Sequence, residues 1–380
     1  MNRSGTYVRQ AANYRAFIPK PLPPKPPVKI EGALQNLLSR ADMALARLDG
    51  LAEMLPNVDL FIAMYVRKEA LLSSQIEGTQ ASLDDLFSFE RGEKLGNLND
   101  VTEVVNYVKA MNYGIERLQS LPMSLRLIKE IHAILLEGVR GSERLPGEFK
   151  RSQNWIGPPG CTLNEATFVP PPFHEAIEAM GDLEHYFHDK AKLPFLIDCA
   201  LIHYQFETIH PFLDGNGRMG RLLITYYLYW KEVLHKPLLY LSYYFKKNRQ
   251  EYYDRLNMVR DTGNYEQWID FFLKGVVDTA GSAMETARKV LELQTHHRRL
   301  LWEKKISSPL AVGILEQLFY TPVVSIGPLA KQFDISYQAA STLVSQLEKA
   351  GILKETTGRK RDKRFVYSDY LNILAEGTKY

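Results

Sequence analysis

The stretch HPFLDGNGRMGR, residues 210–221, places a proton acceptor, a carboxylate and two cations around three glycines. The Gly-Asn-Gly turn at 215–217 can adopt left-handed backbone conformations at little cost, so successive amide N–H groups can point into one concave anion-binding nest. The sequence that follows begins a helix, whose N-terminus also favours anions. Arg218 and Arg221 lie on one face of its first turn and can both bind phosphate oxygens. The stretch therefore predicts a polyphosphate-binding site.

Two further side chains of the stretch indicate chemistry at that site. Asp214 would be repelled by a polyphosphate unless a divalent cation bridges them, and Mg²⁺ commonly binds one carboxylate together with phosphate oxygens. His210, four residues earlier, can accept a proton near neutral pH. A base beside a metal-bound polyphosphate is suited to activating a hydroxyl or a water. The alternative, a loop histidine beside solvated arginines, would leave the nest unexplained.

A second short motif lies in SSQIEGT, residues 73–79. Residues 59–76 have the pattern of a helix, and Gly78 is a typical C-terminal stop. Ser73 and Glu77 then share one face, with the carboxylate at the end of the helix that disfavours anions. An acid at that end favours a nearby cation. Taken alone, the motif is more typical of a surface glutamate.

The elements that must position these residues are mainly helical. Apolar residues recur at helical spacing from 33 to 72, and further helical patterns cover 101–119, 124–138, 173–189, 193–208 and 218–231. The Gly/Pro/Asn-rich segment 154–172 predicts a long-looped β-hairpin between helices. The proline-rich segment 18–28 is expected to form an extended, packed arm.

The pattern changes after about Ser307. Three short amphipathic helices are followed by two β-rich pieces around the basic turn GRKRDKR, residues 358–364. This order is typical of a winged helix-turn-helix. It predicts a boundary between 300 and 308.

Composition limits the possible classes of protein. The chain has 380 residues, 45% of them hydrophobic, and a net charge of +3, which does not by itself indicate nucleic-acid or membrane binding. Its two cysteines, Cys161 and Cys199, have neither metal-ligand nor redox spacing. No segment has the pattern of a signal peptide or a membrane span. We expect a cytoplasmic protein with no membrane partner.

The stretch 210–221 resembles the H-x-F-x-(D/E)-G-N-G-R-x-x-R signature of Fic-domain proteins at every defined position. The resemblance implies transfer of AMP from ATP to a Ser, Thr or Tyr hydroxyl of a target protein, and of the protein itself. His210 would deprotonate that hydroxyl, Asp214 would bind Mg²⁺ (or Mn²⁺), and Phe212 would anchor the loop. The phosphates would be bound by the segment Gly215, Asn216, Gly217, Arg218, Met219, Gly220 and Arg221.

The motif at 73–79 resembles the (S/T)-x-x-x-E-(G/N) inhibitory helix of Fic proteins, located upstream of the core. The resemblance implies that Glu77, with Ser73 beside it, pairs with Arg221 and keeps that arginine from the γ-phosphate of ATP. The enzyme would then idle until the helix shifts or an oligomer rearranges. In some relatives the same glutamate positions a water that removes AMP, so the reverse reaction stays an alternative.

Two other regions resemble family elements near the nucleotide. Residues 165–172 resemble the flap that lines the active site, with Thr167 and Phe168 as the expected contacts. Tyr252 and Tyr253 match a tyrosine pair that the family places near adenosine, where rings can stack on the base. A packed hairpin and core aromatic residues are the alternatives.

The resemblance and the patterns together predict a mainly α protein: a Fic helical core with a β-hairpin flap, followed by a small winged helix-turn-helix domain. We assign residues 1–100 to an N-terminal helical region with the inhibitory helix, 101–300 to the catalytic core and 306–380 to the winged helix. For the last domain, protein contacts or dimer packing are favoured over DNA binding, which stays open. A homo-oligomer, with a dimer favoured, is also expected. A nucleotide-responsive DNA-binding regulator is the non-enzymatic alternative.

Overall fold

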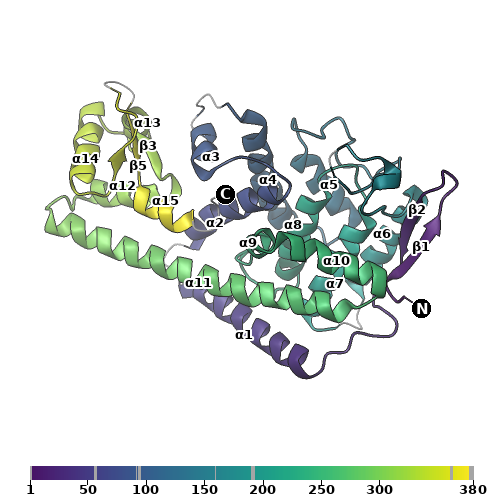
Figure 1. Ribbon diagram of the computed structural model, residues 1–380. Helices are drawn as coiled ribbons and strands as arrows, with labels where there is room; N and C mark the ends of the chain where they lie inside the picture. Colours follow the sequence, from purple (N-terminus) through teal and green to yellow (C-terminus); the bar gives the residue numbers. More distant parts are fainter. Residues whose placement is uncertain are drawn as a thin grey trace.

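The computed structural model describes residues 2–54, 58–90, 92, 96–158, 160–189, 193–359 and 363–375. Most of these residues are helical (Figure 1). The elements up to the signature loop are β1 (Gly5–Arg9), β2 (Arg15–Pro19), α1 (Gly32–Met54), α2 (Val58–Ile76), α3 (Leu83–Glu90), α4 (Leu98–Arg117), α5 (Leu125–Leu135), the 3₁₀ turn Leu163–Glu165, α6 (Phe173–His188) and α7 (Phe195–Ile209). Those after it are α8 (Asn216–Trp230), α9 (Ser242–Lys247), α10 (Arg249–Thr262), α11 (Tyr265–Glu303), α12 (Pro309–Tyr320), β3 (Val323–Ser325), α13 (Ile326–Gln332), α14 (Tyr337–Lys349), β4 (Lys354–Glu355), β5 (Arg364–Val366) and α15 (Ser368–Leu374).

Helix α7 forms the centre of the helical core. Every residue of α7 after Phe195 is buried, as expected for a helix that other elements surround on all sides. Helices α6, α8, α10 and α11 pack against it. Because α7 ends at Ile209 and α8 begins at Asn216, this packing fixes both ends of the signature loop.

The N-terminal segment contains a strand pair that the sequence analysis did not predict. Strands β1 and β2 pair antiparallel, with Gly5 opposite Pro19 and Arg9 opposite Arg15. The Phe17 amide donates to the carbonyl of Val169 at 2.9 Å, and the Ser4 hydroxyl donates to the carbonyl of Val259 at 2.8 Å. The pair therefore joins the predicted hairpin to α10, and residues 1–100 are not entirely helical.

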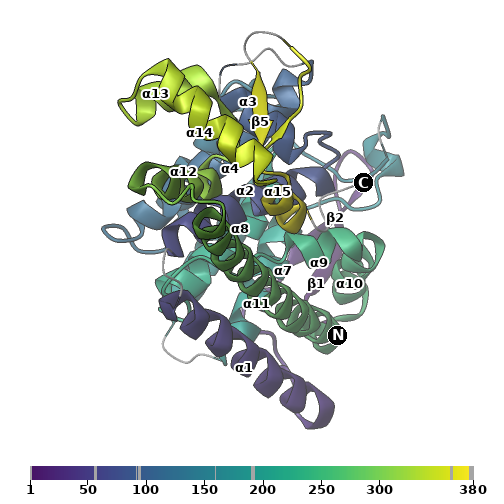
Figure 2. The ribbon, with the colours of Figure 1, turned by 90° about the vertical axis from the view of Figure 1, so that its left-hand side faces the viewer.

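Helix α11 connects the core to the C-terminal elements (Figures 1 and 2). Helix α1 packs along it. Beyond its end, α12 to β5 follow with sheet order β3-β5-β4, both pairs antiparallel. This C-terminal unit also packs against α2 through α12 and α15, and Arg364 forms an ion pair with Asp84 of α3. Residues 360–362 of the predicted basic turn lie outside the described residues.

In the described part of the chain, no helix is both long enough and apolar enough to cross a membrane.

Candidate active site

The loop between α7 and α8 is held by its own side chains. Asn216 accepts a hydrogen bond from the Phe212 amide at 2.9 Å and donates one to the Phe212 carbonyl at 2.8 Å. The Phe212 ring is fully buried and stacks on His132, with 3.6 Å between ring centroids. Gly215 has a φ of 73°, a left-handed conformation that glycine adopts without strain. Phe212 is thus the buried anchor that the resemblance implied, and the Asn216 side chain is committed to the loop.

The loop faces a cavity of about 260 Å³. Six predicted residues of the loop line it: His210, Asp214, Gly215, Asn216, Gly217 and Arg218. Glu77 lines it from the end of α2, together with Arg140 and Arg144 from the segment after α5. Residues from three distant parts of the sequence therefore meet at one opening.

His210 is a neutral base in this cavity. Its side chain is half-buried, and its backbone is left-handed, with φ 50°. Desolvation first, then the positive charges of Lys150 and Arg260, lower the pKa of His210 to about 3. The imidazole is therefore uncharged at neutral pH and can accept a proton.

Arg221 is bound to the predicted inhibitory motif. Its guanidinium donates to the Ser73 hydroxyl at 2.7 Å, the Ser73 carbonyl at 3.0 Å and a Glu77 carboxylate oxygen at 2.8 Å. Burial alone would raise the pKa of Glu77, but Arg221 holds it below its ordinary value. The side chain of Arg221 is 2% exposed, whereas that of Glu77 is 34% exposed. The arginine is enclosed and the glutamate covers it from the cavity side.

Arg218 has a different partner. Its guanidinium lies 3.3 Å from Glu103 of α4, and both side chains are 2% exposed. Its distance to Asp214 is 4.0 Å. Arg218 and Arg221 are therefore held by separate carboxylates, and in this state neither is free to act as one half of the expected phosphate clamp.

Met219 and Gly220 were expected to contact phosphate, but both have other roles in the packing of α8. The Met219 amide donates to the carbonyl of Gly215 at 3.0 Å in the first turn of α8. Because this amide hydrogen already has an acceptor, it is not available to a phosphate. At Gly220 an added Cβ would clash with a carboxylate oxygen of Glu207. Gly220 therefore permits close packing of α8 on α7, and no direct contact with a phosphate is needed to explain it.

Three charged residues at the site, Glu103, Arg140 and Arg144, belong to no motif of the sequence. Arg144 lies 3.7 Å from Asp214, and Arg140 lies 3.6 Å from Glu103. Both arginines are more than half exposed, so they add positive charge to the mouth of the cavity. In the sequence, the two arginines are indicated only by the segment GVRGSERLPG, a glycine-rich loop that contains both of them.

Among its described residues, the predicted hairpin contains one isolated β-bridge, between Ile156 and Phe168. Thr167 is exposed, but Phe168 is 3% exposed and its ring packs against Arg260, with the guanidinium carbon 3.7 Å from the ring centroid. Neighbouring residues of an extended segment point to opposite faces. The side chain of Phe168 is therefore a packing group rather than the expected contact, while contact through Thr167 stays a prediction.

The two tyrosines, Tyr252 and Tyr253, also differ in exposure. Tyr252 is 1% exposed, and its hydroxyl lies 2.9 Å from Nε2 of the buried His203. Tyr253 is half-buried, and its ring lies under the Arg249 guanidinium at 5.4 Å. Adjacent residues of a helix point about 100° apart, so only Tyr253 is placed to contact a ligand. Tyr252 belongs to the core, contrary to expectation.

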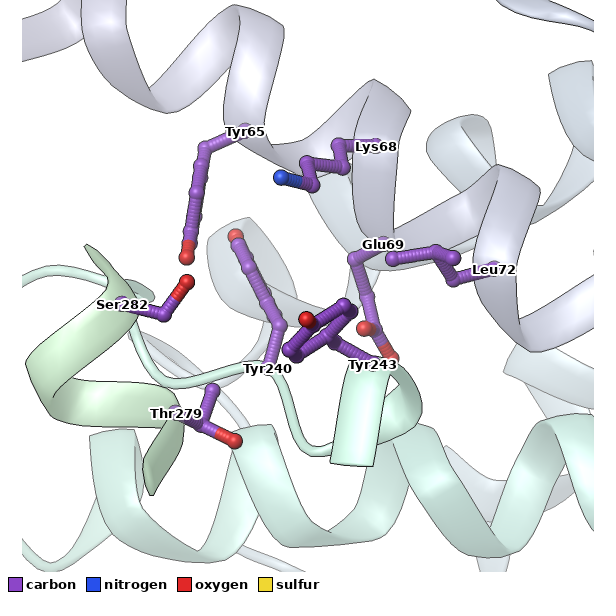
Figure 3. Close-up of a pocket in the computed structure, with 8 residues that line it drawn as sticks. All are labelled: Tyr65, Lys68, Glu69, Leu72, Tyr240, Tyr243, Thr279 and Ser282. Atoms are coloured by element: carbon purple, nitrogen blue, oxygen red, sulfur yellow. The ribbon is translucent and has the colours of Figure 1, made fainter. Parts of the chain in front are cut away.

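Helix α2 is anchored upstream of the inhibitory motif. Glu69, one turn before Ser73, borders a small, separate cavity of about 10 Å³ between α2, α9 and α11 (Figure 3). Its carboxylate accepts hydrogen bonds from Ser242 and from Tyr107, the latter at 3.2 Å. Burial raises the pKa of Glu69 to about 7. Glu69 and Ser73 lie four residues apart on one buried face of α2. Glu77 follows one residue beyond the end of the helix, where it borders the cavity.

Comparison with known proteins agrees with this geometry. Residues 35–116 match the model described as Fic/DOC family N-terminal, and residues 122–228 match the model of the Fic/DOC family. The chain belongs to the Fic/DOC family.

Curated relatives of this Fic chain include the protein adenylyltransferase Fic of Drosophila grimshawi, 29% identical over 178 residues, which are 46% of this chain and 33% of the relative. A probable protein adenylyltransferase of Aquifex aeolicus is 25% identical over 202 residues, 52% of this chain and 55% of the relative. The match thus spans about a third to a half of these relatives. A crystal structure of a Fic family protein from Desulfovibrio desulfuricans has a TM-score of 0.59 at 21% identity, covering 90% of this chain and 97% of that one, and supports the fold.

Proposed function

We propose that this Fic protein is a protein adenylyltransferase, which moves AMP from ATP to a Ser, Thr or Tyr hydroxyl of a target protein and of itself. The observation that carries the proposal is the neutral imidazole of His210 in one cavity with Asp214 and the 215–217 turn. The relatives named protein adenylyltransferase give independent support.

In the proposed reaction, His210 accepts the proton of the target hydroxyl. The oxygen then forms a bond to the α-phosphorus of ATP, the bond to the β-phosphate oxygen breaks, and diphosphate leaves. Amide groups of the loop would stabilise the charge on the phosphates, since donors fixed in advance need no reorganisation. Thr167 and Tyr253 are the proposed contacts for target and adenosine.

The donor set at Asp214 fits Mg²⁺ (or Mn²⁺) only if ATP supplies most of the ligands. Among the described residues no group of three or more His, Cys, Asp or Glu side chains could hold a metal. Asp214 is a single carboxylate, 28% exposed, that lines the cavity. One carboxylate with phosphate oxygens is a usual magnesium site. When bound, the ion would neutralise phosphate charge, and Asp214 would first have to leave Arg144.

We further propose that Glu77 inhibits the enzyme. Arg221 is enclosed by Ser73 and Glu77, so it cannot reach the terminal phosphate of ATP without breaking these bonds. The carboxylate would also repel that phosphate, because Glu77 itself lines the cavity. Transfer would be weak until α2 moves.

Labelled ATP tests the reaction class. Glu77→Gly protein with Mg²⁺ is incubated with ATP labelled on the α- or the γ-phosphorus. The proposal predicts stable protein label from the α-position only, and none in Glu77→Gly/His210→Ala. Label from the γ-position would indicate phosphate transfer. Loss of label from previously labelled protein on incubation with wild type would favour AMP removal.

We propose that the C-terminal unit is a winged helix-turn-helix. The element order α12-β3-α13-α14-β4-β5 supports this, with Tyr337 60% exposed at the start of α14. DNA binding is an open role for it, and a gel-shift of random duplexes at low salt tests it. No shift would leave protein contacts or dimer packing as the proposed role.

A further inference from the structure

A buried lysine lies directly behind the signature loop. Lys150 is 1% exposed, and its ammonium donates to the Asn154 side-chain oxygen at 2.6 Å and approaches the carbonyl of Ile209 at 3.5 Å. A lysine is rarely buried to this extent, because desolvation of its charge is costly. Burial lowers the pKa of Lys150 to about 7. The contacts of a buried lysine must therefore compensate for this desolvation.

Its partner, Asn154, extends the contact along the loop. The Asn154 amide nitrogen donates to the carbonyl of His210 at 3.0 Å and to that of Phe212 at 2.7 Å. The backbone amide of Lys150 donates to the carbonyl of Pro211 at 2.8 Å. The four consecutive carbonyls from 209 to 212 are thus all contacted by two residues.

This clamp acts where the backbone is least favourable. A residue other than glycine in the left-handed region, as His210 is, costs of order 1 kcal/mol and persists only when its surroundings fix it. The carbonyls at the end of α7 also carry the negative end of the helix dipole, which a cation stabilises. In its protonated form Lys150 supplies that cation, and Asn154 supplies the fixed donors.

We propose that Lys150 and Asn154 are positioning residues that hold His210 in its left-handed conformation, with the imidazole directed at the acceptor hydroxyl. The inference rests on the proposed AMP transfer, because it concerns the placement of that reaction's base. Asn154 shares the Phe212 carbonyl with Asn216 of the 215–217 turn, but three of the four carbonyls bound by the clamp lie at 209–211. We therefore expect the two residues to act mainly on the base and only weakly on ATP binding.

The test compares Lys150→Met, Lys150→Arg and Asn154→Asp in the full-length Glu77→Gly protein. Methionine fills the space without a donor, and aspartate keeps the shape of asparagine but directs oxygen at two carbonyls. Displacement of a reacting group by about 1 Å can lower a rate on the order of a hundredfold. We expect kcat to fall roughly ten- to a hundredfold in Lys150→Met and Asn154→Asp, with the Kd for ATP changed less than about threefold.

Two controls separate positioning from folding. Lys150→Arg restores a cationic donor and should recover most of kcat. Asn106→Asp alters another buried asparagine that donates to a backbone carbonyl, that of Glu137, at 2.7 Å, and should leave kcat of the folded fraction unchanged. If Lys150→Met does not fold, Asn154→Asp carries the test.

A readout independent of turnover is the NMR signal of the His210 ring, assigned by its absence in His210→Ala. It should move in Lys150→Met and Asn154→Asp and return in Lys150→Arg. If Lys150→Met and Asn154→Asp leave kcat and the ring signal unchanged, or lower the affinity for ATP as much as kcat, the positioning role is overturned. The proposed AMP transfer would not be affected by either result. A parent that transfers no AMP would instead refute the proposed function, and the ring signal would still report on the clamp.

Discussion

The Glu77–Arg221 contact gives the sharpest prediction. Glu77→Gln keeps the size of the side chain and an oxygen that can accept from Arg221, but removes the negative charge. The charge is therefore the main feature of the resting contact that changes. If that charge keeps Arg221 from ATP, AMP transfer should rise in this variant.

The size of the effect follows from the geometry. A hydrogen bond between charged groups contributes about 1.5–3 kcal/mol when it is well enclosed. Glu77 is 34% exposed, so solvent screening reduces the contribution of its charge to about 1 kcal/mol. That corresponds to roughly a fivefold rise in the fraction of molecules with Arg221 released. Glu77→Gly, which leaves no acceptor, should exceed it.

The assay is the initial rate of label transfer from α-labelled ATP at fixed Mg²⁺. Glu90→Gln is a matched control, because Glu90 also pairs with an arginine, Arg67, at 2.8 Å and is 36% exposed. Glu90 is not among the residues that line the cavity, so the Glu90→Gln variant should transfer AMP at the rate of wild type. Equal rates for Glu77→Gln and wild type, or equal rises in both variants, would refute the inhibitory role.

Three other predictions concern buried charges. Glu103→Ala leaves the guanidinium of Arg218 buried without its carboxylate and should lower the free energy of unfolding by about 3 kcal/mol in urea titrations; a change below about 1 kcal/mol would contradict this. Glu69 has a pKa raised by burial from 4.5 to about 7, so the stability that its protonated form contributes is complete below pH 4.5 and is lost as pH rises through 7. Glu69→Gln should therefore be more stable than wild type at pH 8 by up to roughly 3 kcal/mol, and much less so at pH 5; a difference independent of pH would contradict it. Because the pKa of His210 lies at about 3, kcat/KM should show no fall between about pH 8 and 6 from protonation of this histidine, and a limb near its ordinary pKa of about 6.5 would contradict the desolvated environment.

The signature loop was predictable because its information is local. Asp214, the 215–217 turn and the helix after it are adjacent in sequence, and their chemistry follows from residue types and spacing. The contact of Glu77 with Arg221 required the family resemblance, since 144 residues separate the two. Glu103 and Lys150 gave no signal, because a charged residue in a helix or loop is most often solvated.

Other differences arise from orientation. A helix or strand pattern predicts an element but not its rotation about its axis. Tyr252 and Phe168 were therefore assigned to the site although they are buried, while the adjacent Tyr253 and Thr167 are the more exposed residues. The β1–β2 pair is short, and the buried residues of β2, Ala16, Phe17 and Pro19, do not follow a strict alternation. Only its packing against Val169 and α10 shows why these residues form strands.

The most direct test of the account is the intact mass of Glu77→Gly protein after incubation with ATP and Mg²⁺. The account predicts a gain of one or more AMP units that is absent in Glu77→Gly/His210→Ala and small in wild type. The Glu77→Gly protein is incubated with saturating ATP, once alone and once with cell extract as a source of targets. An unchanged mass of every protein in both incubations would contradict the account. So would an equal gain without His210.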